Sequence, residues 1–133
     1  MAHIQKLGMM NMAMEERGKL TEVAKELIGL LDGIEKDHDR ENPKYAEIRK
    51  KTFDLLKHLT NIASFCDDTS RNRIRKISEL VTNSLEEVVH FSSLRKICGI
   101  AVTLQVDFNK SPFMMNELDV NALDNEFKSM VEK

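Results

Sequence analysis

The chain has 133 residues, of which 41% are apolar and 32% are charged, with only 5 glycines and 2 prolines. This length suits one domain and leaves no room for a second substrate-binding lobe, and the composition excludes a disordered or collagen-like chain in favour of a helix-rich, soluble one. The 20 basic and 22 acidic residues give a net charge of −2, so no overall field draws the chain towards nucleic acid or an anionic membrane.

Cysteine usage and hydropathy predict an intracellular protein. Cys66 and Cys98 are too few for a disulfide framework and are not spaced as metal ligands, which indicates buried thiols in a reducing compartment. The first residues lack the apolar run of a signal peptide, and nowhere do about 18 apolar residues follow one another. We therefore expect a cytoplasmic location and no contact with a membrane.

The first two expected elements are an arm and a long helix. Residues 1–14 are rich in methionine and compatible with a short helix or an arm. Leu20, Val23, Leu27 and Ile34 then recur with the spacing of one helical face, which predicts a helix over residues 15–37. A polar connector follows this helix.

A second helix is expected from Asn42-Pro43, because Asn caps free backbone N–H groups and Pro suits the first helical position. Its apolar seam resembles a coiled-coil a/d pattern and is the clearest stripe in the chain. The seam consists of Tyr45, Ile48, Thr52, Leu55, Leu59, Ile62 and Cys66.

Residues 70–109 carry helical periodicity that fits either one helix or two. A single helix of this length would reach about 60 Å, whereas a compact domain of this size has a radius of gyration near 14 Å. We therefore prefer two helices with a break at Phe91-Ser92-Ser93, with Gly99 as a weaker candidate for the break, and one long helix over 70–109 remains the alternative. Residues 101–106 have strand propensity, but a single strand would have nothing to pair with.

The C-terminal segment, residues 111–133, is expected to form an acidic amphipathic helix or tail after Ser111-Pro112. The fold class predicted for the whole chain is all-α. We expect a compact bundle of about four main helices with up-and-down connections in residues 15–110, flanked by short terminal helices or arms.

Methionine is confined to the two terminal segments, whereas Leu, Ile and Val build the body. Because methionine is unbranched and polarizable, it suits surfaces that adapt to a partner, although loosely packed arms would explain the same pattern. An amphipathic tail of this kind can lie in a groove of another protein or of a second copy of the chain. The candidate partner-binding residues are Met9, Met10, Met12, Met14, Phe113, Met114, Met115, Leu118, Leu123, Phe127 and Met130.

A basic cluster of Arg71, Arg73, Arg75 and Lys76 opens the expected third helix, where the helix dipole favours anions instead. Three interpretations stay open. In the first, the cluster contacts the phosphates of a nucleic acid, although no aromatic residues interleave with it. In the second, it is a solvated helix face, which is the commonest use of such a run. In the third, it meets the acidic C-terminal segment, within one chain or between chains.

Two Glu-x-x-His pairs, Glu35/His38 and Glu87/His90, match the spacing found in di-iron bundles. The first lies at the end of an expected helix and the second lies off the apolar stripe, and few other carboxylates are available. We therefore expect no metal ion and no other cofactor.

Catalytic residues are not assigned either. His58 flanks the apolar stripe of the second helix, but its neighbours lack the small-residue context of phosphotransfer domains. A nucleophilic Cys66 or Cys98 would need a histidine brought close by the fold. The motifs of α/β-hydrolases, zinc metalloproteases and P-loop proteins are absent.

The function predicted from these patterns is that of a non-enzymatic adaptor or regulatory module, which binds a protein or a second copy of itself through its Met-rich terminal segments. A nucleic-acid-associated accessory protein that uses the basic cluster is the first alternative. A phosphotransfer or metal-dependent helical protein is the second.

Overall fold

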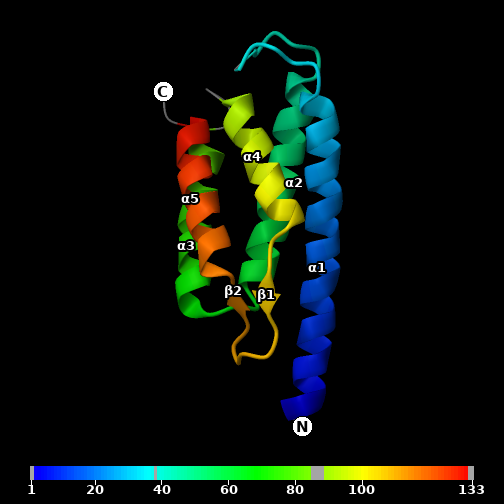
Figure 1. Ribbon diagram of the computed structural model, residues 1–133, viewed down its shortest axis with the longest axis vertical. Helices are drawn as coiled ribbons and strands as arrows, with labels where there is room; N and C mark the ends of the chain where they lie inside the picture. The colour runs from blue at the N-terminus through cyan, green and yellow to red at the C-terminus, as the bar shows by residue number, and fades with distance from the viewer. Residues whose placement is uncertain (1, 38, 85–88, 132–133) are drawn as a thin grey trace.

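The computed structural model describes residues 2–37, 39–84 and 89–131 (Figure 1). The described part of the chain forms helices and one short hairpin, and the predicted all-α fold class is confirmed. The elements are α1 (Ala2–Leu31), α2 (Tyr45–Ala63), α3 (Asp68–Ser84), α4 (Phe91–Val102), β1 (Val106–Asp107), β2 (Met114–Met115) and α5 (Glu117–Val131).

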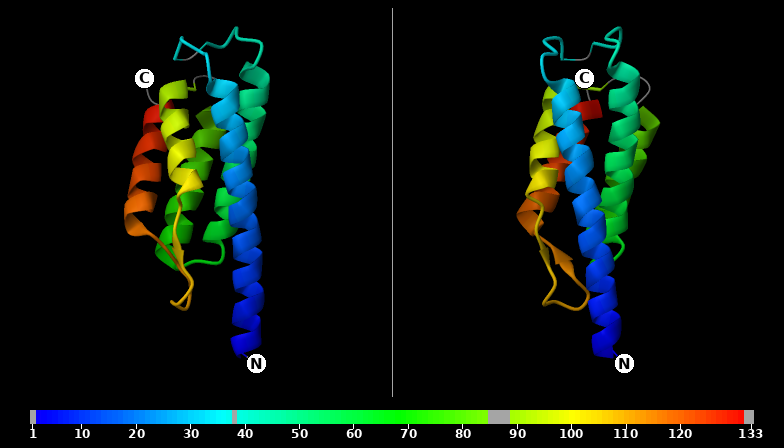
Figure 2. Two further views of the ribbon diagram at one scale, coloured as in Figure 1. Left: turned by 45° about the vertical axis from the view of Figure 1, so that its right-hand side comes forward. Right: turned by 90° about the vertical axis from the view of Figure 1, so that its right-hand side faces the viewer.

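The helices run along the long axis of the molecule and enclose one core (Figures 1 and 2). α1 packs against α2 and α4, α5 packs against α3 and α4, and α2 packs against α3, so that the neighbours close a ring. The C-terminal helix is therefore a full member of the bundle and not an appended tail. No helix in the described residues is long and apolar enough to span a membrane.

α1 differs from the expected helix at both ends. It has 30 residues, a length of about 45 Å, and it includes the segment expected to be a separate arm. Met, Leu and Ala are good helix formers and no proline interrupts them, so the helix continues through the 14/15 boundary. It ends at Leu31 because Gly33 adopts a φ of 80°, a left-handed conformation that ends many helices.

α2 follows the expected seam closely, because all seven seam residues are buried. Thr52, the polar member of the seam, donates its hydroxyl hydrogen to the Ile48 carbonyl at 2.7 Å, which satisfies that group in the core. The predicted start at Asn42-Pro43 is wrong: α2 begins at Tyr45, and its N-cap is Lys44 without a side-chain cap. The Asn42 side chain accepts a hydrogen bond from the Lys44 N–H at 2.9 Å, within the turn that precedes the helix.

The alternative of one long helix over residues 70–109 is wrong. α3 ends at Ser84, His90 is extended, and α4 begins at Phe91. The expected break residues Phe91, Ser92 and Ser93 therefore lie in the first turn of α4, and the break comes before them. Asp37 stabilises this start from a distance: its carbonyl accepts from the Phe91 N–H at 2.6 Å, and its carboxylate accepts from the Ser92 N–H at 2.7 Å. An anion at the first turn also suits the helix dipole.

The expectation that the segment 101–106 would have no strand partner is wrong only at its last residue, because Ala101 and Val102 belong to α4 and Val106 begins β1. β1 pairs antiparallel with β2, with Val106 opposite Met115 and Asp107 opposite Met114. Phe113 forms a further bridge to Cys66, and its carbonyl accepts from the Asp67 N–H at 2.9 Å. The hairpin thus occupies the stretch in which the fourth helix was expected to continue.

Candidate interaction surface and charged groove

The N-terminal part of α1 extends beyond the other elements of the bundle (Figures 1 and 2). Further along α1, Ala13, Leu20 and Leu27 form a buried stripe that faces the core. Met9 lies four residues before Ala13 on the same stripe, yet its side chain is 43% exposed, and Met12 beside it is 56% exposed. The core-facing stripe of α1 therefore continues onto side chains that the described part of the chain leaves about half exposed.

We call residues 7–14 of α1 the α1 overhang; the segment contains no charged residue, and in it Ala13 is buried whereas Met9 and Met12 are exposed. Leu7 and Met14 are 43% and 50% exposed on the side opposite Met9 and Met12. Met10 alone among its four predicted methionines is partly buried and packs against the core. Exposed apolar side chains without interspersed charge are typical of an interaction site.

A pocket of about 260 Å³ lies beside Met12, between α1 and the end of α2. Phe65, which is partly buried against the core, forms its apolar side. The complete lining is Met12, Glu15, Glu16, Lys19, Asn61, Ser64 and Phe65.

His58 links α2 to α1 next to this pocket. Its Nδ1 lies 2.7 Å from the Glu16 carboxylate, and both side chains are less than one-fifth exposed. Burial raises the pKa of Glu16, but hydrogen bonds from His58 and Asn61 outweigh this effect and hold the pKa below its ordinary value. His58 thus pairs with a carboxylate of α1.

The C-terminal candidates divide sharply by exposure. Leu118 is 77% exposed and Met114 is 43% exposed, so both remain available to a partner. The others lie in the core because α5 is a bundle helix, and they are therefore removed from the candidate surface. The residues corrected in this way are Phe113, Met115, Leu123, Phe127 and Met130.

The basic cluster does not form one patch. Arg71 contacts Asp68 at 2.9 Å on α3 itself, whereas Arg73 reaches Asp124 of α5 at 3.4 Å. The contact between Arg73 and Asp124 agrees with the third interpretation of the cluster, in which it meets the acidic C-terminal segment within one chain. Arg75 is exposed and lies about 160° around the helix from Arg73, because each residue advances an α-helix by about 100°.

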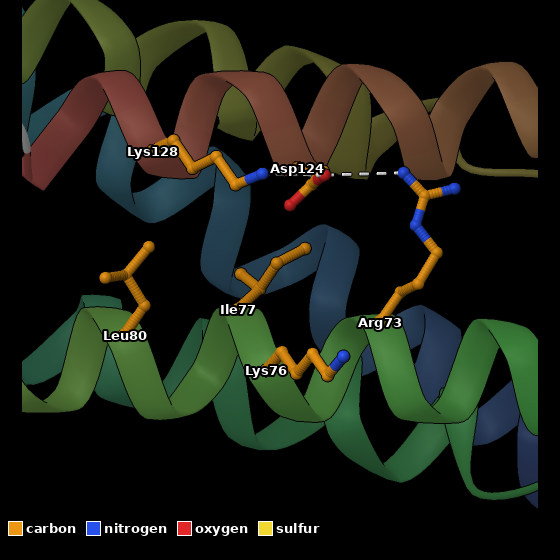
Figure 3. Close-up of a pocket in the computed structure, with 6 residues that line it drawn as sticks. All are labelled: Arg73, Lys76, Ile77, Leu80, Asp124 and Lys128. Carbon is orange, nitrogen blue, oxygen red and sulfur yellow. Dashed lines mark hydrogen bonds and ion pairs between the residues drawn. The ribbon is translucent and has the colours of Figure 1, made fainter.

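Arg73 and Lys76 share a shallow pocket of about 380 Å³ with residues of α5, which we call the α3–α5 groove (Figure 3). Asp124 lies between two cations, 3.4 Å from Arg73 and 3.3 Å from Lys128. The full lining is Arg73, Lys76, Ile77, Leu80, Asp124 and Lys128. Asp124 and Lys128 were not among the predicted site residues, although their i, i+4 spacing on an amphipathic helix is a usable signal.

The two Glu-x-x-His pairs cannot be followed as pairs, because His38 and Glu87 lie outside the described residues. His90 Nδ1 is 3.1 Å from the Asp37 carboxylate. Within the described parts of the chain, no three His, Cys, Asp or Glu side chains gather as metal ligands would.

Both cysteines are buried free thiols. Burial raises the pKa of Cys66 to about 11 and the pKa of Cys98 to about 12. Because the thiolate is the nucleophilic form, thiols with such pKa values are almost entirely inert at neutral pH.

Comparison with protein-family models, with curated proteins and with solved structures found no match to this chain.

Proposed function

We propose that this protein is a non-enzymatic interaction module, of adaptor or regulatory type, that self-associates through the face of the α1 overhang that carries Met9 and Met12. The observation that supports this proposal most strongly is that the core-facing stripe of α1 continues to Met9 and Met12, whose side chains are exposed. Burial of such side chains contributes about 25 cal/mol per Å² of apolar surface, which favours a partner that covers them.

A second copy of the chain is the partner that this surface fits best. A two-fold interface brings the same patch of both copies together, so the patch must be compatible with itself. A surface that holds like charges would repel its copy, whereas the α1 overhang carries no charge and is self-compatible. The pocket between Met12 and Phe65 offers a place for an apolar side chain of the other copy.

The position of the overhang also permits this pairing. It projects from one end of the molecule, so two copies can meet antiparallel with their bundle bodies pointing in opposite directions (Figure 2). The overhang spans only about 12 Å of helix. This is small for an interface, since stable complexes bury about 1,600 Å², and we expect a weak dimer with a dissociation constant of roughly 10–100 μM.

The test is a pair of single substitutions, Met12→Glu and Met14→Glu. The two methionines have similar exposure, 56% and 50%, and lie about 160° apart around the helix. Met12→Glu places a charge in the interface and should raise the dissociation constant of the dimer by roughly tenfold or more in sedimentation equilibrium. Met14→Glu, the matched control, should change it by less than about twofold.

Circular dichroism of both variants checks that the helices are retained. Equal weakening by the two substitutions, or no weakening by Met12→Glu, would overturn the assignment of this face. For the cellular setting we propose a reducing cytoplasm, supported by the two free thiols at Cys66 and Cys98.

A further inference from the structure

The α3–α5 groove has an excess of positive charge that the folded chain does not neutralise. Arg73, Lys76 and Lys128 surround it, and Asp124 is the single carboxylate in its lining. Asp124 is shared between Arg73 and Lys128, and within the described residues Lys76 has no ion pair. The groove is therefore positive although the whole chain has a net charge of −2.

The floor of the groove is apolar. Ile77 is only 2% exposed and lies in the middle of the groove, and Leu80 is partly buried and lies at the end of the groove away from Arg73 (Figure 3). A ligand that fits such a lining has an anionic group for the rim and an apolar body for the floor.

We propose that the α3–α5 groove binds a small phosphomonoester, whose phosphate competes with Asp124 for Arg73 and is held also by Lys76 and Lys128. A phosphomonoester is close to a dianion at neutral pH, which matches the excess of two cations over the carboxylate. The Arg guanidinium suits phosphate because its donors form a planar fork, and Lys acts as a point charge.

The shape of the site favours one phosphate group over a nucleic-acid strand. The remaining cations of the basic cluster, Arg71 and Arg75, do not line the groove. Its lining contains no aromatic side chain on which a base would stack. This proposal is independent of self-association, because the groove and the α1 overhang share no residue.

The experiment titrates the full chain with phenyl phosphate and, separately, with inorganic phosphate at constant ionic strength, followed by amide chemical shifts. We expect saturable shifts in α3 and α5, with phenyl phosphate bound at least roughly threefold more tightly because its ring reaches Ile77 and Leu80. An absence of saturable binding of phenyl phosphate would overturn the proposal.

Lys76→Gln and Arg75→Gln form a matched pair, since each removes one positive charge from neighbouring positions of α3. Lys76→Gln should weaken phenyl phosphate binding by roughly fivefold or more, and Arg75→Gln by less than about twofold, because only Lys76 lines the groove. Thermal unfolding without ligand should be unchanged in both variants. An equal loss of binding in the two variants would mean that the phosphate responds only to the net charge of α3, and it would contradict a specific site in the α3–α5 groove.

Asp124→Asn gives a result of opposite sign. Removal of the competing carboxylate should tighten phenyl phosphate binding by roughly threefold or more, because Arg73 and Lys128 then lose their internal anion. Weaker or unchanged binding in a variant that retains the wild-type circular dichroism would overturn the proposed competition.

Discussion

Asp37 joins parts of the chain that lie far apart in the sequence. It belongs to the connector after α1, yet its carboxylate accepts from the Ser92 N–H and lies 3.1 Å from His90 Nδ1. Arg95 strengthens the same junction by donating to the Leu31 carbonyl at 2.6 Å. Burial raises the pKa of Asp37, but hydrogen bonds from Ser92 and His90 outweigh this effect and lower the pKa.

This cap predicts a pH-dependent contribution to stability. Asp37→Ala should lower the free energy of unfolding by about 0.5–2 kcal/mol at pH 7, the usual effect of losing a helix cap. Because the folded-state pKa is depressed, the contribution is complete above the ordinary Asp pKa of 3.8 and is lost as the pH falls through the folded-state value. Urea unfolding of wild type and variant between pH 7 and about pH 3 should show the difference shrinking; a constant difference would contradict the cap.

At the residue scale, local signals were predictable and distant partners were not. The seam of α2 was readable because its spacing alone decides which side chains face inward. The Asp37 cap, the His58–Glu16 pair and the Arg73–Asp124 pair each join residues that are far apart in sequence. Only the pairing of the basic cluster with the acidic segment had been among the open interpretations, because complementary charge is visible in a sequence while geometry is not.

At the scale of elements, the existence of each helix could be predicted from the periodicity of apolar residues, whereas the positions of the helix ends depended on backbone conformation. α1 was expected to stop at 37, but Gly33 ends it earlier through its φ of 80°. The β1–β2 hairpin was missed because each strand is only two residues long, so neither has a period that could be detected.

Two glycine substitutions test the account of α1 with opposite signs. Gly18 lies within the helix, and a Cβ added there would meet no atom within 4 Å. Gly18→Ala should therefore raise the free energy of unfolding by about 0.5–1 kcal/mol through better helix propensity. Gly33→Ala should lower it by about 1 kcal/mol, because an alanine side chain disfavours positive φ. Chemical denaturation measures both, and a change of the same sign in both variants would contradict the assigned end of α1.

At the scale of the whole molecule, the N-terminal end of α1 extends beyond the other elements of the bundle (Figure 1). The confinement of methionine to the chain ends predicted two candidate surfaces, but the two ends differ in the fold. α5 is built into the bundle, whereas the α1 overhang stays exposed with Met9 and Met12 on the stripe that is buried elsewhere. Periodicity could not separate these cases, because an amphipathic helix has the same pattern whether its own chain or a partner covers it.

The most direct test of self-association is the molar mass of the untagged chain by light scattering, measured from about 5 μM to about 1 mM across the expected dissociation constant. The account predicts a mass that rises from the monomer value of 15.3 kDa towards that of a dimer as concentration increases. A mass that stays at the monomer value throughout this range would contradict it.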